Sequence, residues 1–136
     1  MACSLSATCS VDAQLGLNFA CSNSATCRGT ATDGAQLACS NSARCTGIKL
    51  GKSAQVQCSN SATCDVEVGE SAQISCTEDS VCTVKCTGAC TYVCGGLSAA
   101  NAKCTCTGSG CASGFTCSTG QVVTCPDGRR VCGQAC

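Results

Sequence analysis

Small or apolar residues alternate with polar residues along most of the first 94 positions of the chain. In the clearest stretch, Ala72, Ile74 and Cys76 occupy one set of alternate positions, and Gln73 and Ser75 occupy the other. A period of two residues predicts β-strands, because successive side chains of a strand point to opposite faces. Short Ser-Asn-Ser and Gly-x-Ser segments separate the strands and predict turns.

This pattern of two strands and two turns repeats with a unit of 18 residues. Successive units open with the heptapeptides CSLSATC, CSNSATC, CSNSARC, CSNSATC and CTEDSVC. One extra residue near Gly47 lengthens the third unit, and we expect a β-bulge there. Each unit predicts one coil of a parallel β-solenoid, in which equivalent residues stack at about 4.8 Å per coil. In this register Lys52 lies beside Glu70 and Asp33, and Lys49 lies beside Glu67, so opposite charges are neighbours.

The composition changes how such a chain must be stabilised. Of the 136 residues, 20 are Cys, 2 are Phe, 1 is Tyr and none is Trp or His. Large apolar side chains are too few for an ordinary core, so we expect cysteines to replace it. The formal net charge is zero and aromatic residues are nearly absent, which argues against a nucleic-acid partner. No apolar run reaches the roughly 18 residues of a membrane span, so no membrane insertion is expected.

Three arrangements of the repeated cysteines compete: bridges within a coil, bridges between adjacent coils, and metal sites. Equivalent residues of adjacent coils lie about 4.8 Å apart, which is wide for the roughly 3.8 Å between the Cβ atoms of a disulfide. Zinc sites favour C-x₂₋₄-C, whereas the repeat here is C-x₅-C; only Cys104-Thr-Cys106 and the four-residue steps from Cys82 to Cys94 are closer to a metal pattern. We therefore expect no metal, no cofactor and the intra-coil pairs Cys3–Cys9, Cys21–Cys27, Cys39–Cys45, Cys58–Cys64 and Cys76–Cys82.

The strict period is lost near the C-terminus. We expect coils over residues 1–94 and an irregular, cysteine-rich cap over residues 95–136. Pro126-Asp127-Gly128 predicts the turn of a hairpin over residues 121–132, with a Cys125–Cys132 bridge. The other C-terminal pairings do not follow from the sequence. The expected fold is thus all-β: a two-sided parallel β-solenoid of 18-residue coils with intra-coil disulfides and a C-terminal cap.

The turns of the repeat contain the motif C-x-x-S-x-x-C, and this motif resembles a local feature of the beetle hyperactive antifreeze proteins. Those proteins are disulfide-rich β-solenoids with the motif T-C-T-x-S-x-x-C, and Cys86-Thr-Gly-Ala-Cys90-Thr resembles their capping region. The resemblance implies a disulfide-rich solenoid and, as a function, ice binding through a ladder of threonines. That ladder is not matched: Ala or Gln and Ser flank most of the first cysteines, and Thr-Cys-Thr occurs once, around Cys106.

Two files of residues are expected to run along the outside of the coils. An amide ladder consists of Asn18, Gln36, Gln55 and Gln73, and a hydroxyl ladder consists of Ser4, Ser22, Ser40, Ser59 and Thr77. One interpretation is structural: stacked amides hydrogen-bond along the axis, and Ser suits turns. The other is that the ladders are docking faces for a second solenoid.

Catalysis has little support, because there is no His and because Asp65, Glu67 and Glu70 follow one strand and its turn. Many cysteines indicate an oxidising, extracellular location. The regular winding begins at Cys3, so we expect an open strand edge there, which favours pairing with another copy. The sequence thus predicts a non-enzymatic extracellular structural protein that associates with itself, end to end or face to face, into a fibre or surface assembly. The alternative is an ice-binding protein with an ice surface as its partner, and carbohydrate binding stays open because amides and hydroxyls are plentiful.

Overall fold

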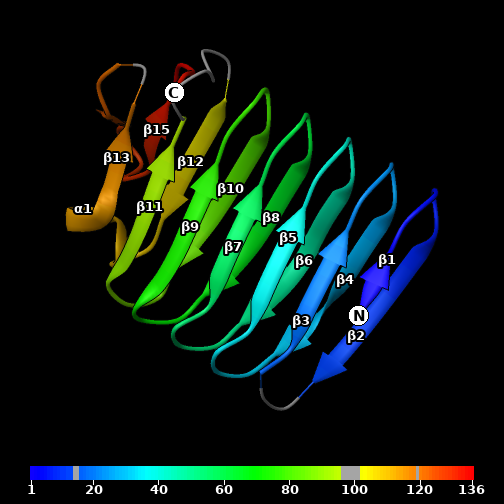
Figure 1. The fold of residues 1–136 in the computed structure, drawn as a ribbon. Coiled ribbons are helices and arrows are strands. Elements are labelled where there is room, and N and C mark those ends of the chain that lie inside the picture. Colours follow the sequence, from blue (N-terminus) through cyan, green and yellow to red (C-terminus); the bar gives the residue numbers. More distant parts are fainter. Residues whose placement is uncertain (14–15, 96–101, 119) are drawn as a thin grey trace.

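The computed structural model of the protein describes residues 1–13, 16–95, 102–118 and 120–136. The chain winds into a parallel β-solenoid, which confirms the predicted fold class (Figure 1). Sheet A contains, in order, β1 (Ala2–Cys3), β3 (Asn18–Cys21), β5 (Gln36–Cys39), β7 (Gln55–Cys58), β9 (Ala72–Cys76), β11 (Cys90–Cys94) and β13 (Phe115–Cys117). Sheet B contains β14 (Val123–Thr124), β15 (Arg130–Cys132), β12 (Lys103–Thr107), β10 (Val81–Cys86), β8 (Thr63–Val68), β6 (Arg44–Leu50), β4 (Thr26–Ala31) and β2 (Thr8–Ala13).

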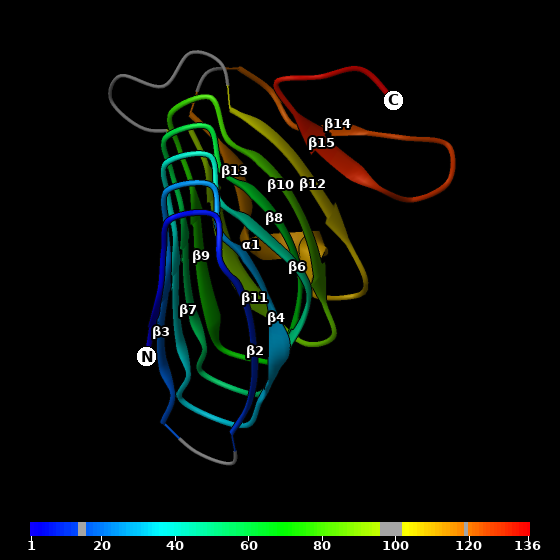
Figure 2. The same ribbon diagram turned by 90° about the vertical axis from the view of Figure 1, so that its right-hand side faces the viewer.

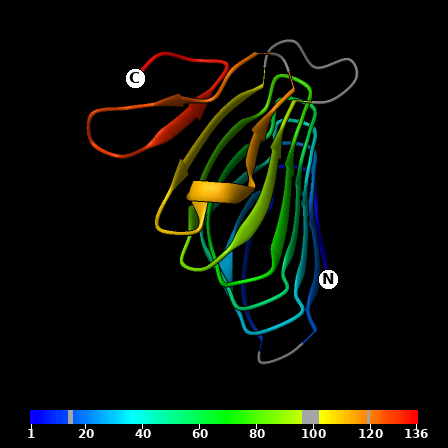
Figure 3. The same ribbon diagram turned by 90° about the vertical axis from the view of Figure 1, so that its left-hand side faces the viewer.

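The two sheets form the two sides of a flattened coil, and each coil contributes one strand to each sheet. Figure 2 views the stack from its N-terminal end and shows the β14–β15 hairpin, which extends sheet B beyond β12. Figure 3 views the opposite end, where the short helix α1 (Cys111–Gly114) lies against β11. The extra residue of the third coil forms the expected bulge: the register of β6 shifts between Cys45 and Ile48, and Gly47 has a φ of 64°.

The Ser-Asn-Ser turns have a backbone shape that explains their sequence. Asn23 and Ser24 have positive φ values of 54° and 64°, and the N–H of Ala25 donates to the carbonyl of Ser22 at 3.2 Å. Two successive positive φ values are the geometry of a type I′ turn, and Asn tolerates that region better than most residues. The same pair of conformations recurs in the first five coils, at Leu5-Ser6, Asn23-Ser24, Asn41-Ser42, Asn60-Ser61 and Glu78-Asp79.

The interior between the sheets is narrow, and both sheets contribute buried apolar side chains to it. Sheet B contributes Ile48, Val66 and Val84, which are in register. Each strand of sheet A from β3 onward contributes one large residue to an apolar stack, namely Phe19, Leu37, Val56, Ile74, Tyr92 and Phe115. The rings of Tyr92 and Phe115 lie 4.8 Å apart, and the Tyr92 hydroxyl donates to the carbonyl of Cys82 at 3.1 Å. Burial raises the pKa of the Tyr92 phenol well above its usual value.

Beside this apolar stack runs a column of seven disulfides, which we call the disulfide column. Five of its bridges are the intra-coil pairs expected from the sequence, and all five are present. The column continues with Cys94–Cys104 and Cys117–Cys132, because Cys94 stacks on Cys76 and Cys117 stacks on Cys94. The column therefore extends from β1 to the last strand of sheet A.

The expected Cys125–Cys132 bridge is wrong. Strand β15 pairs antiparallel with β12 and places Cys132 opposite Cys104, in the position that completes the seventh bridge with Cys117. Cys125 bonds instead to Cys136. The hairpin itself is present, since β14 and β15 pair antiparallel. Parallel pairing also extends past residue 94, because β12 pairs with β10 and β13 pairs with β11, so the C-terminal segment is more regular than the sequence indicated.

One buried polar atom stands out in the turns. Ser80 is fully buried where the three preceding coils have Ala25, Ala43 and Ala62, and its hydroxyl has no hydrogen-bond partner among the described residues. An unsatisfied buried hydroxyl is destabilising, so Ser80→Ala is expected to raise the free energy of unfolding by about 1 kcal/mol. Guanidinium denaturation with the bridges intact measures the change. Ala62→Ser introduces the same orphan hydroxyl one coil earlier and should be destabilising; a less stable Ser80→Ala variant would contradict the interpretation.

Candidate binding surface

The outer face of sheet A carries the amide ladder expected from the sequence. Asn18 pairs in register with Gln36, Gln36 with Gln55, and Gln55 with Gln73, and all four are exposed. Adjacent parallel strands lie about 4.8 Å apart, so the amides repeat at that interval along the solenoid. No hydrogen bond joins the four side-chain amides to one another in the described part of the chain. Their donors and acceptors are thus available to another molecule.

A second file runs beside the amide ladder on the same face. It consists of Ala20, Ala38, Gln57, Ser75 and Val93. Apart from Ala20, the residues of the two files line a shallow groove of about 570 Å³ that crosses β3, β5, β7, β9 and β11. Sequence analysis missed Gln57, Thr91 and Val93 as members of this surface. The alternation of the sequence could have identified all three, because each occupies one of the alternate strand positions that point away from the interior.

The strands of sheet A contain none of the 16 charged residues of the chain. Charges occupy the outer face of sheet B, the turns and the C-terminal hairpin. Asp65, Glu67 and Lys85 are examples on sheet B, and Glu67 and Lys85 lie 4.0 Å apart in an exposed ion pair. Covering this face does not remove a charge from water, and its amides keep their hydrogen bonds if the partner offers polar groups, so the face is suited to contact with a neutral polar partner.

The charged turns have a mainly local role. Lys52 forms an exposed ion pair with Glu70 at 2.7 Å, and its backbone N–H donates to Asp33. The Glu70 carboxylate raises the pKa of the Lys52 ammonium group through this hydrogen bond and its charge. In the hairpin turn, the backbone N–H of Arg129 lowers the pKa of Asp127. These contacts join neighbouring coils or close a turn, and they leave the face of sheet A untouched.

The hydroxyl ladder lies at the first position of the type I′ turns. The carbonyls of Ser4, Ser22, Ser40, Ser59 and Thr77 each accept a hydrogen bond from the N–H three residues later. This placement supports the interpretation as turn chemistry. The asparagines that directly follow Ser22 and Ser40 form a further ladder, which sequence analysis did not identify. In it, the Asn41 side-chain amide donates to the Asn23 side-chain oxygen at 3.5 Å.

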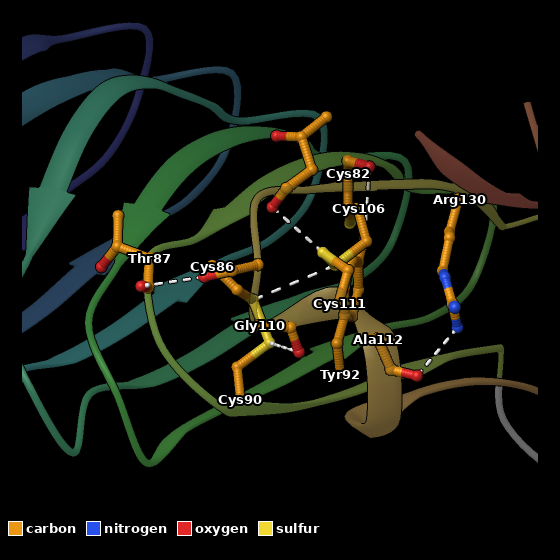
Figure 4. The surroundings of a disulfide bond; sticks show 12 residues. Cys82, Cys86, Thr87, Cys90, Tyr92, Cys106, Gly110, Cys111, Ala112 and Arg130 are labelled. Atoms are coloured by element: carbon orange, nitrogen blue, oxygen red, sulfur yellow. Dashed lines mark hydrogen bonds between the residues drawn. A yellow bond between two sulfur atoms is a disulfide. The ribbon is translucent and has the colours of Figure 1, made fainter. Parts of the chain in front are cut away.

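Several cysteine sulfurs gather closely enough to suggest metal ligands. Around β10 and α1, the sulfurs of Cys86, Cys90 and Cys106 lie within 4.8 Å of one another (Figure 4). Each sulfur belongs to a disulfide, however, since Cys86 bonds to Cys90 and Cys106 bonds to Cys111. All 20 cysteines are joined in ten disulfides. A thiolate is the form that binds metal, so these clusters are stacked bridges.

These features define the molecule as a disulfide-rich parallel β-solenoid with one uncharged, grooved face. No family model, curated protein or solved structure matches the chain. The similarity to beetle antifreeze proteins therefore rests on the short turn motifs alone. In the described residues, no helix is long and apolar enough to cross a membrane. Ten disulfides are consistent with a protein from an oxidising compartment.

Proposed function

We propose that this chain is a non-enzymatic extracellular structural protein that associates with itself end to end. The observation that carries the proposal is the outermost strand of sheet B. Among the described residues, β2 pairs with β4 on one side and with no strand on the other. An unpaired strand of six residues is a template for another strand. The ten disulfides support an extracellular location, where bridges persist.

The hydrogen bonds of the first coil indicate which groups of β2 are available. The carbonyl of Ala7 accepts from Thr26 on β4, and backbone groups alternate in direction along a strand. The N–H and C=O groups of Thr8, Ser10 and Asp12 therefore face outward. Two copies can align antiparallel with Ser10 opposite Ser10 of the second copy. This register also places Thr8 opposite Asp12 and forms about six backbone hydrogen bonds.

A fibre requires the opposite end of the solenoid to pair as well. That end offers β13 of three residues and β14 of two, because the antiparallel hairpin pairs with the β12 edge of sheet B. A short edge strand is a poor template. The geometry therefore favours association through the β2 end first, with fibre growth dependent on a second, weaker contact.

Light scattering after size exclusion, over a wide range of concentrations, tests this proposal. The 136-residue chain is expected to form dimers or larger assemblies. Ser10→Pro removes the central outward N–H from a strand edge that tolerates proline, so it should yield monomers, whereas Ser10→Thr keeps the N–H and should associate. Ser10→Lys places two like charges opposite each other and should also yield monomers. A wild-type monomer at every concentration would reject the proposal, and dimers without filaments in negative stain would reject the fibre.

Ice binding is the second candidate. It is favoured by the uncharged face of sheet A, on which equivalent residues of adjacent strands are in register, and by the turn motif shared with the beetle proteins. Alternating amides, Ala and Ser in place of paired threonines weigh against it. Thermal hysteresis and ice shaping by the wild-type chain are the measurements, and their absence would remove this candidate.

A further inference from the structure

We propose that the groove on the outer face of sheet A binds a neutral, extended, β1→4-linked polysaccharide that lies along the solenoid axis. The proposal uses a different surface from the β2 edge, so it is independent of self-association. It rests on three properties of the groove: its amides, its lack of charge and its shape.

The amides offer the hydrogen bonds that sugars need. Each of Gln36, Gln55 and Gln73 has a carbonyl oxygen that accepts and an NH₂ group that donates. Sugar hydroxyls also donate and accept, so one amide can contact two hydroxyls. The amides repeat once per coil, at about 4.8 Å, and a straight glycan presents equivalent hydroxyls at regular intervals. Successive sugars of a β1→4-linked chain are turned by about half a rotation, so such a ligand can repeat the same contact at every second coil and offer the opposite edge of a sugar to the coil between.

The charge distribution selects a neutral glycan over an acidic one. Binding of carboxylate or sulfate groups uses Arg or Lys, and the strands of sheet A contain neither. Lys52, in the turn before β7, is already paired with Glu70. An anionic chain in this groove would lose water without gaining a counter-charge.

The shape of the groove favours a narrow chain over a second copy of the same face. The groove crosses five strands, which corresponds to a length of about 19 Å. A slender polymer can lie in the hollow between the two files. Two hollowed faces placed together would leave a gap, and atoms that line a gap lose their contacts. A β1→4-linked chain is straight, whereas an α1→4-linked chain coils away from a linear site.

No aromatic side chain among the described residues lines the groove, so affinity must come from several hydrogen bonds added along the glycan chain. Each such bond contributes modestly to binding. A hexasaccharide is therefore expected to bind markedly better than a disaccharide, and polymeric glycan better still.

Retention on insoluble cellulose and chitin, together with calorimetry of cellohexaose and chitohexaose, tests the proposal. The wild-type chain should bind at least one of these probes. The double variant Gln55→Ala/Gln73→Ala should bind about tenfold more weakly, because two hydrogen-bonding rungs are lost. Asp65→Ala is the matched control: it changes an exposed residue of β8, in the same coil but on the opposite sheet, and should bind like wild type. Circular dichroism and the mass of the non-reduced chain confirm that each variant keeps its fold and bridges.

Three results would overturn the proposal. The first is no binding of any of the four neutral probes, and the second is an equal loss in Asp65→Ala and in the double glutamine variant. The third is tighter binding of dextran sulfate than of cellohexaose or chitohexaose. Ser10→Pro separates this proposal from self-association, because it should yield monomers while its binding to cellulose or chitin per chain stays unchanged.

Discussion

Reduction of all ten disulfides is expected to unfold the protein at room temperature without any denaturant. Each bridge of the first five coils closes a loop of about seven residues, which corresponds to roughly 2 kcal/mol of chain entropy. Ten bridges together contribute on the order of 20 kcal/mol if they are additive. This exceeds the net stability of a typical domain, about 5–15 kcal/mol. The thin apolar stack cannot hold the coils without them.

Most of the cysteines are buried, so the chain is first reduced and alkylated in denaturant and the denaturant is then removed. Reduction should raise the mass by about 20 Da, two hydrogens for each of the ten bridges. The alkylated chain should lack the β-sheet circular dichroism of the native protein. An oxidised sample taken through the same denaturant cycle is the control and should recover its spectrum. A β-sheet spectrum from the alkylated chain would contradict the central role of the bridges.

Gly29→Ala is expected to be severely destabilising for a single substitution, with a loss of about 3 kcal/mol or more in the free energy of unfolding. Gly29 lies in β4 between Val11 and Ile48 of the neighbouring coils, and its φ is 150°. L-residues rarely adopt this conformation, and a Cβ at this position would overlap the carbonyl oxygen of Val11. That oxygen belongs to the backbone of β2, so it cannot move aside without disturbing the first coil.

Gly47→Ala is the matched control, because Gly47 has a positive φ of 64° but a methyl group added there would meet no atom within 4 Å. This variant carries only the conformational penalty of an alanine in the left-handed region, about 1–2 kcal/mol. Guanidinium unfolding of the oxidised proteins measures both changes. Equal losses for the two variants would show that the overlap with Val11 has no effect.

The sequence predicted the coils because two signals repeat together along the chain. The period of two residues places Ile74 and Val56 inside, and the constant spacing of six residues places each pair of cysteines across a turn. A cross-coil arrangement would have needed neighbouring strands to be closer than sheets allow. The fold class and five bridges could therefore be predicted from local pattern alone.

The C-terminal bridges could not be predicted in the same way, because their spacing changes while their place in the column does not. Cys94 and Cys104 are 10 residues apart, and Cys117 and Cys132 are 15 apart. In the second case Cys132 lies on an antiparallel strand that is not part of the 18-residue repeat, so the repeat does not predict this bridge. The groove was missed for a related reason. Alternation places Gln55 and Gln57 on one face, but it does not indicate whether the surface between the two files is flat or hollow.

The position of the bridges also determines how the molecule responds to proteolysis. Cleavage of a Ser-Asn-Ser turn, such as the one between Cys21 and Cys27, leaves both new ends joined through sulfur. Cleavage at the opposite turn, after Lys52, falls between the Cys39–Cys45 and Cys58–Cys64 bridges, and no covalent link spans it. Along the first five coils, one edge of the solenoid is thus tolerant of nicks, and cleavage at the other would divide the chain into separate fragments. Near the C-terminus this second edge is also closed, because Cys86–Cys90 and Cys106–Cys111 span the connections after β10 and after β12.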